Sequence, residues 1–181
     1  SSDLMVAEAL GPGRRITHLH WGGGSPTILK PEDMTALRAS VARHFPGVEA
    51  AEFAVEIDPR DMTPERLDAL AAAGMARASI GVQDFDEQVQ RAIGRMQGDA
   101  MTREVILGLR ARGVKSVNID FLYGLPHQTE ASLARTIEQV LALGPDRLAL
   151  FGYAHVPWMA KRQKMIPAEA LPGTEARRAQ A

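Results

Sequence analysis

Cysteine is absent from this chain of 181 residues. Its absence excludes disulfides, thiolate metal sites and cysteine nucleophiles from the chain itself. Aromatic residues make up only 5% of the sequence, and no apolar run approaches the roughly 18 residues that a membrane-spanning helix needs. The charges nearly cancel, with 21 Lys and Arg against 22 Asp and Glu, so the chain lacks the positive excess typical of nucleic-acid binding.

The residues that are present describe a globular domain. Hydrophobic residues form 45% of the sequence and charged residues 24%, and a chain of this size buries roughly 70% of its unfolded surface. No basic region followed by an apolar one is seen at the start, so no signal peptide is predicted and we expect a cytoplasmic protein. From the charge balance and the absence of long apolar runs, we expect neither nucleic-acid nor membrane partners. The chain begins without Met, and we expect it to be a piece of a longer protein.

Short apolar runs of strand length alternate with longer amphipathic segments. The runs cover residues 16–21, 53–57, 78–82, 117–122 and 148–153. They are mostly apolar rather than alternating, which is typical of strands buried on both faces of a parallel sheet.

The amphipathic segments carry helix-boundary signals. Thr63 and Pro64 indicate an N-cap and a first helical position, and Gly74 indicates the end of that helix. Further helices are predicted to begin at Pro31 and at about 129, and another to cover about 99–112. Five βα repeats predict an α/β fold with a parallel sheet, either an open doubly wound sheet or part of a barrel.

The pattern weakens after about residue 157. Residues 161–164 form a basic patch, and the last ten residues are expected to be frayed.

Polar residues and glycines follow every predicted strand. The strand ends carry Gly22 to Gly24, Glu56, Gln83, Asp120 and the pair Tyr153 and His155. In βα folds the carboxyl ends of the strands form one rim, where binding sites are built. The pattern therefore predicts a polar pocket over an apolar core.

Each of these residues also has a purely structural interpretation. The glycines could form only a tight turn. Glu56 and Asp120 could pair with Arg or cap a helix, although two acids on one rim also suit amino or ribose hydroxyl groups of a ligand. Gln83 could cap the next helix in competition with Asp84 and Asp86.

Three basic residues have the same ambiguity. Arg95, taken alone, is more typical of a solvated helix end than of a ligand clamp. His18 and His20 point to one face of a strand and could ligate a metal, but no third ligand is evident, and we favour core or rim histidines. No metal site is therefore predicted in this chain.

Five segments, taken in order, resemble the oxygen-independent coproporphyrinogen III oxidases (dehydrogenases) of the radical S-adenosylmethionine superfamily. They are HWGGGSPT at 20–27, EIDPR at 56–60, GVQDF at 81–85, NIDFLYGLP at 118–126 and YAHVP at 153–157. The resemblance covers about residues 16–166, and the combination is far more specific than any single motif.

The resemblance implies a partial (β/α)6 barrel and two cofactors, S-adenosyl-L-methionine and a 4Fe–4S cluster. The cluster is held by three cysteines in a C-x3-C-x2-C motif. S-adenosylmethionine is cleaved reductively to a 5′-deoxyadenosyl radical, which abstracts hydrogen from two propionates of coproporphyrinogen III. These lose CO2 and become vinyl groups, giving protoporphyrinogen IX in haem biosynthesis.

The cysteine motif is missing here, so the resemblance implies an internal fragment that is inactive by itself. Residues 1–166 would be a partial barrel domain without its first strand and cluster loop, and residues 167–181 the start of a linker to a C-terminal domain. The parent enzyme would need a reductant for its cluster. We expect the fragment to self-associate through the exposed edge of the strand that begins near Ile16.

The resemblance also implies which residues contact S-adenosylmethionine. By position in the chain, they are Gly23, Gly24, Ser25, Glu56, Gln83, Arg95, Asp120 and Ala154. No catalytic residue is assigned. Backbone groups at the glycines, acceptors on the two acids and the Arg95 guanidinium suit the amino, carboxylate and ribose groups of this molecule.

Two alternatives remain. A haem-binding paralogue of the same superfamily, a haem chaperone, shares some motifs, but the segments at 118–120 and 153–157 favour the oxidase. A non-radical TIM-barrel lyase would need a Lys at a strand end, and Lys115 instead precedes its strand.

Overall fold

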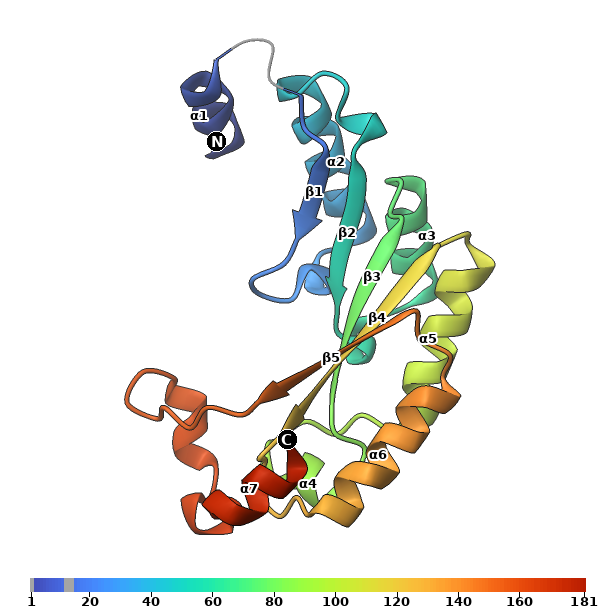
Figure 1. Cartoon of the computed structure of the whole chain (residues 1–181). Helices are drawn as coiled ribbons and strands as arrows, with labels where there is room; N and C mark the ends of the chain where they lie inside the picture. The colour runs from blue at the N-terminus through green and yellow to red at the C-terminus, as the bar shows by residue number, and fades with distance from the viewer. Residues whose placement is uncertain (1, 12–14) are drawn as a thin grey trace. The chain divides into compact units, whose positions relative to one another are not determined.

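The computed structural model describes residues 2–11 and 15–181 (Figure 1). Its strands are β1 His18–Trp21, β2 Glu52–Ile57, β3 Arg77–Gln83, β4 Ser116–Tyr123 and β5 Arg147–Gly152. Its α-helices are α1 Ser2–Leu10, α2 Pro31–His44, α3 Pro64–Ala72, α4 Glu87–Ala92, α5 Asp99–Ala111, α6 Glu130–Ala142 and α7 Thr174–Gln180. Short 3-10 helices are η1 Pro26–Ile28, η2 Val48–Ala50, η3 Pro59–Asp61, η4 Lys161–Met165 and η5 Ala168–Ala170.

The five strands form one sheet in the order β1-β2-β3-β4-β5. Neighbouring strands pair in parallel, with Leu19 opposite Phe53, Val55 opposite Ala78, and Asp120 opposite Ala149. The sequential order confirms the predicted α/β fold and excludes a sheet whose strand order reverses in the middle. Among the residues described, no helix is long and apolar enough to cross a membrane.

The helix boundaries follow the predicted signals. Thr63 caps α3 by accepting a hydrogen bond from the Arg66 N–H, and Pro64 is the first helical residue. Gly74 adopts a φ of +86°, the left-handed conformation that favours glycine at a helix end. At α6, Thr129 and Ser132 form a reciprocal capping box.

Burial alternates along the central strands, so the prediction of strands buried on both faces is wrong. In β2, the side chains of Phe53, Val55 and Ile57 are buried, whereas Ala54 and Glu56 on the other face are half-buried. β3 and β4 show the same alternation. Small and polar residues on the second face, such as Ser79 and Gly81 in β3, leave it only partly covered.

Strand β5 departs furthest from the prediction. Leu148, Leu150 and Phe151 are 43%, 38% and 56% exposed, although the sequence suggested a buried strand. β5 is the last strand in the sheet order, so it has a strand neighbour only on the β4 side within the described chain. An edge position leaves its apolar side chains without the cover that an inner strand receives.

The chain divides into two compact units. The first comprises residues 1–80 and 105–117, and the second residues 81–104 and 118–181. In the first unit Val41, Phe45 and Val48 form an apolar cluster. In the second, Val89, Leu125 and Tyr153 form another.

The C-terminal residues are folded, so the expectation of a frayed end is wrong. Helix α7 covers Thr174–Gln180, and Gln180 is only 6% exposed. Its side chain accepts a hydrogen bond from the Gly124 N–H at 3.0 Å and donates one to the Gln128 carbonyl at 2.8 Å. These bonds hold the last helix on the loop that follows β4.

Candidate functional site

In the first unit, the glycine-rich loop after β1 meets the end of β2. The Gly23 N–H donates a hydrogen bond to Oε2 of Glu56 at 3.2 Å, and Nε2 of His20 lies 3.2 Å from Oε1 of the same carboxylate. A Cβ on Gly22 would lie 2.5 Å from Oε1 of Glu56 and 2.7 Å from Nε2 of His20, so a side chain there would displace both groups. Glycine at this position therefore lets the carboxylate and the imidazole approach the backbone of the loop.

The histidines of β1 do not assemble a metal site. His20 contacts Glu56, and Nδ1 of His18 lies 3.0 Å from the hydroxyl of Thr17. Within residues 2–11 and 15–181, no group of three His, Cys, Asp or Glu side chains has the arrangement of a metal centre.

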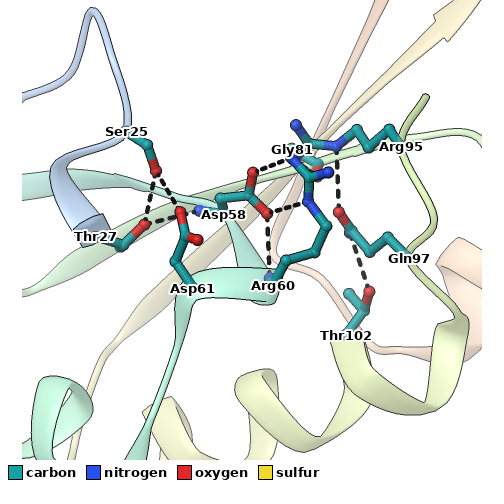
Figure 2. Close-up of polar contacts among 9 residues, drawn as sticks. All are labelled: Ser25, Thr27, Asp58, Arg60, Asp61, Gly81, Arg95, Gln97 and Thr102. Carbon is teal, nitrogen blue, oxygen red and sulfur yellow. Dashed lines mark hydrogen bonds and ion pairs between the residues drawn. The ribbon is translucent and has the colours of Figure 1, made fainter. Parts of the chain in front are cut away.

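Ser25 is engaged with its own unit (Figure 2). Its hydroxyl donates to Asp61 at 2.9 Å and lies 2.9 Å from the hydroxyl of the buried Thr27. Thr27 in turn accepts the Asp58 N–H at 3.4 Å. These bonds join the glycine-rich loop to the turn after β2 and fix the course of both segments.

Arg60 and Asp58 form a bidentate ion pair beside that turn, with nitrogen–oxygen distances of 3.0 and 2.7 Å (Figure 2). The hydrogen bond to Asp58 raises the pKa of the Arg60 guanidinium. The ion pair engages the Asp58 carboxylate, whereas the carboxylates of Glu56 and Asp61 accept hydrogen bonds from the glycine-rich loop.

In the second unit, Gln83 and Arg95 meet at Gly81. A terminal nitrogen of Arg95 donates to the Gly81 carbonyl at 2.9 Å (Figure 2). A Cβ on Gly81 would lie 2.9 Å from Nε2 of Gln83 and 3.4 Å from Arg95. Glycine at this position therefore makes room for an amide and a guanidinium side by side.

Gln83 has an unusual backbone conformation for a non-glycine residue. Its φ is +69°, in the left-handed region, which costs about 1–3 kcal/mol outside glycine. The hydrogen bonds that cap α4 come from Asp86 and not from Gln83. Strained residues of this kind cluster at ligand sites, so the conformation favours a binding role over the capping role.

Buried amides hold Arg95 in place. Oε1 of Gln97 accepts from Nε of Arg95 at 3.3 Å, and Nε2 of Gln97 donates to Thr102 at 3.2 Å (Figure 2). Gln90 accepts the Gln97 N–H at 2.9 Å and donates to the Gln97 carbonyl at 2.6 Å. Gln90 and Gln97 are almost fully buried, so Arg95 is oriented by a rigid support rather than freely solvated.

Asp84, which the sequence suggested only as a helix cap, is a buried structural acid. Its carboxylate accepts hydrogen bonds from the Thr136 hydroxyl at 2.7 Å, the Gln128 amide at 2.5 Å and the Asp86 N–H at 2.7 Å. Burial raises the pKa of this carboxyl, and the hydrogen bonds oppose that rise. Asp84 thus ties the end of β3 to α6 and to the loop after β4.

Asp120 lies in β4 on the face opposite the core. Its Oδ1 accepts a hydrogen bond from the Asn118 amide at 2.6 Å, two residues earlier on the same face. The side chain is half-buried, so the carboxylate is not part of the apolar core. The bond to Asn118 fixes its orientation.

The segment after β5 is organised by side-chain contacts. The Tyr153 hydroxyl lies 3.1 Å from Nδ1 of His155, and burial raises the pKa of Tyr153. The carbonyl of Ala154 accepts a hydrogen bond from Nε2 of Gln163 at 3.0 Å. Ala154 itself is exposed.

Taken by unit, the predicted site residues gather in two groups. Gly23 and Glu56 contact each other in the first, and Gln83 and Arg95 share the space at Gly81 in the second. The first group offers a carboxylate acceptor and open backbone groups, and the second offers guanidinium and amide donors. The buried supports Asp84, Gln90 and Gln97 were missed, because their partners are distant in sequence or are backbone groups.

Comparisons with known proteins identify the family of this chain. The model of the radical SAM superfamily matches residues 4–140. An oxygen-independent coproporphyrinogen III oxidase of Paracoccus denitrificans is 54% identical over 96% of this chain and 38% of its own length. One of Cereibacter sphaeroides is 53% identical over 93% of this chain and 37% of its own length.

A solved structure gives the same result. The coproporphyrinogen III oxidase of Escherichia coli, a radical SAM enzyme, superposes with a TM-score of 0.92 and 38% sequence identity. The match covers 98% of this chain and 41% of that one, so the chain spans about two fifths of the relatives it matches. The motifs, the sheet and the family match lead to one conclusion: this chain belongs to the radical SAM superfamily.

Proposed function

We propose that this chain is part of an oxygen-independent coproporphyrinogen III oxidase, an oxidoreductase of haem biosynthesis. The observation that carries the proposal is the 54% identity to an enzyme of that name over 96% of the chain. The fold agreement with the Escherichia coli enzyme supports it. Because the chain spans only part of these relatives, the activity is proposed for the longer protein.

The predicted site residues are suited to S-adenosylmethionine. Gly23 and Gly24 leave space beside their backbone, since an added Cβ at either would meet no atom within 4 Å. Glu56 and Asp120 offer acceptors for amino or hydroxyl groups, and Arg95 offers a planar fork for a carboxylate. We assign Ser25, Gln83 and Ala154 to the same cofactor, by their places in the matching motifs.

This chain contains no cysteine ligands for a 4Fe–4S cluster. The chain contains no cysteine, so it supplies none of the thiolates that a 4Fe–4S cluster requires. In the proposed enzyme the cluster ligands come from outside these 181 residues. The residues present serve the cofactor and the substrate instead.

In the proposed reaction two propionates of coproporphyrinogen III become vinyl groups, and each loses CO2, a hydrogen atom and an electron. S-adenosylmethionine and the cluster supply the radical chemistry when bound. The roles of this chain are to orient the cofactor through Glu56, Asp120 and Arg95 and to exclude water from the site. The buried Gln97 holds Arg95 in its orientation, which limits the reorganisation needed on binding.

Turnover by the longer, cluster-containing protein tests the proposal. We expect anaerobic conversion of coproporphyrinogen III to protoporphyrinogen IX with S-adenosylmethionine and a reductant. The haem-binding paralogue is the second candidate, because members of one superfamily share this fold. Haem binding without protoporphyrinogen formation would favour that candidate.

Gly81→Ala tests the second-unit group directly. The added methyl group would lie 2.9 Å from Nε2 of Gln83, a flexible side-chain end that can move aside, so folding should change little. Displacing Gln83 and Arg95 should weaken S-adenosylmethionine binding about tenfold, the effect of losing one charge-assisted hydrogen bond. Equilibrium binding to the longer protein measures this.

Gly98→Ala is the matched control, because an added Cβ there meets no atom within 4 Å and the backbone is not left-handed. Its affinity should equal that of the unchanged protein. Equal losses in both variants would contradict the assignment of Gly81.

Further parts of the proposal concern domains and partners. We propose that residues 1–166 belong to the barrel domain, that residues 167–181 begin the connection to another domain, and that the enzyme is cytoplasmic and uses a cellular reductant.

The fragment should self-associate, since β1 pairs only with β2 among the described strands and unpaired edges recruit other strands. Light scattering that finds only monomer at all concentrations would contradict this.

A further inference from the structure

The segment from Val156 to Ile166, here called the 156–166 loop, exposes three large apolar side chains. Trp158, Met159 and Met165 are 75%, 78% and 81% exposed. Burial of large apolar side chains is favourable, so three such residues exposed among the eleven positions 156–166 are unfavourable in water unless a partner covers them.

The 156–166 loop is nevertheless held in place. Oε1 of Gln163 accepts the Val156 N–H at 2.5 Å, and its Nε2 donates to the Ala154 carbonyl at 3.0 Å. At the far end, Ile166 packs on the apolar cluster that includes Tyr153 and Leu125. Both ends of the loop are therefore fixed, and one is fixed on Ala154, a residue proposed to contact the cofactor.

The charge of this region is positive. Residues 147–168 contain no Asp or Glu. Lys161 and Lys164 are exposed, and neither forms an ion pair with any described residue. They lie three positions apart in the 3-10 helix η4, so they project from the same side.

We propose that the 156–166 loop binds the substrate, an apolar macrocycle with several carboxylate side chains. The loop provides what such a ligand needs: an exposed indole and two thioethers for the ring system, and two cations on one side for the carboxylates. This inference rests on the proposed function and adds a substrate-binding segment to it. Its attachment to Ala154 places the segment next to a proposed cofactor contact.

A second copy of this chain fits the loop less well. Apolar contact between two such loops would also bring Lys161 and Lys164 of each copy toward like charges, and residues 147–168 contribute no acid to compensate them. A ligand with carboxylates removes that repulsion. The observed combination of charge and apolar surface therefore favours the acidic macrocycle.

Binding of coproporphyrin III, the stable fluorescent form of this macrocycle, to the 181-residue chain tests the inference. We expect saturable quenching of Trp158 fluorescence. The Trp158→Phe variant retains only the buried Trp21, so its difference from the unchanged chain gives the Trp158 signal. Lys161→Gln with Lys164→Gln should weaken binding about tenfold, since two exposed ion pairs contribute up to ~1 kcal/mol each. The tetramethyl ester of coproporphyrin III should bind the unchanged chain and this variant equally.

Lys30→Gln with Lys115→Gln is the matched control, because both residues are exposed and the change in net charge is the same. Its binding should change less than twofold. Equal weakening by both double variants, no binding of coproporphyrin III, or a lysine variant that binds like the unchanged chain would overturn the inference. Self-association that depends on Trp158 without porphyrin binding would overturn it in favour of a second copy.

The same substitutions in the longer enzyme separate this inference from the proposed function. If both hold, the loop variants raise KM for coproporphyrinogen III about tenfold and retain kcat. Protoporphyrinogen formation with an unchanged KM would leave the function standing and overturn the loop assignment. An unchanged enzyme that forms no protoporphyrinogen would instead contradict the function.

Discussion

Replacing Glu56 or Asp120 by alanine is expected to weaken S-adenosylmethionine binding about ten- to hundred-fold. Each change removes a charge-assisted hydrogen bond and leaves a donor of the ligand unpaired, at a cost of roughly 1.5–3 kcal/mol. Glu56 is about half exposed, with 47% of its side chain accessible, so the Gly23 N–H that it leaves can be hydrated in the free protein. Folding should therefore suffer less than binding.

Asp146→Ala is the control for these two variants. Asp146 is exposed and precedes β5, at the amino end of that strand, whereas the candidate site lies at carboxyl ends. The measurement is equilibrium binding to the cluster-reconstituted longer protein, with unfolding followed in parallel. Unchanged affinity in both test variants, or the same loss in all three, would show that these acids do not bind the cofactor.

Replacing Asp84 by alanine is expected to destabilise the chain by about 2–4 kcal/mol. The change leaves three donors without an acceptor, from Thr136, Gln128 and Asp86, in a place where Asp84 is 0% exposed. Relief of the buried charge offsets part of this loss. Urea denaturation, with and without the substitution, gives the difference in unfolding free energy.

Two further variants sharpen this test. Glu138→Ala changes an exposed acid on the same helix as Thr136 and should cost less than about 0.5 kcal/mol. Asp84→Asn replaces the carboxyl group by an amide that does not titrate, so this variant is the reference for the pH dependence of stability. A loss in Asp84→Ala no larger than that of Glu138→Ala would contradict the structural role.

The stability of the unchanged chain relative to Asp84→Asn should change with pH in a definite direction. Burial raises the pKa of Asp84, so the folded chain binds this proton more tightly than the unfolded chain does. Between the ordinary Asp pKa of about 3.9 and the raised value, the contribution of this group to stability falls as pH rises. The unchanged chain should therefore lose stability relative to Asp84→Asn as pH increases through that window.

Local signals in the sequence predicted the fold well. Thr63 with Pro64, Gly74 and Thr129 mark helix boundaries through contacts within a few residues, and such contacts can be anticipated from spacing alone. The parallel order followed from the alternation of strands and helices. The first-unit contact between Gly23 and Glu56 also agrees with the predicted rim.

Long-range contacts could not be predicted in the same way. Asp84 receives hydrogen bonds from Gln128 and Thr136, which lie 44 and 52 residues away. The left-handed backbone of Gln83 has no local sequence signal, since glycine is the usual residue in that conformation. The exposure of Phe151 depends on the position of β5 at the sheet edge, which its composition does not reveal.

The contacts of Gln180 have a practical consequence for proteolysis and for protein production. Proteolytic cleavage just before Gln180 would separate this residue from the fold and leave the Gly124 N–H and the Gln128 carbonyl without their partner. Because Gln128 also bonds Asp84, such cleavage would loosen the loop after β4 from its far side. A tag or fusion joined directly after α7 therefore needs a spacer that leaves Gln180 able to dock.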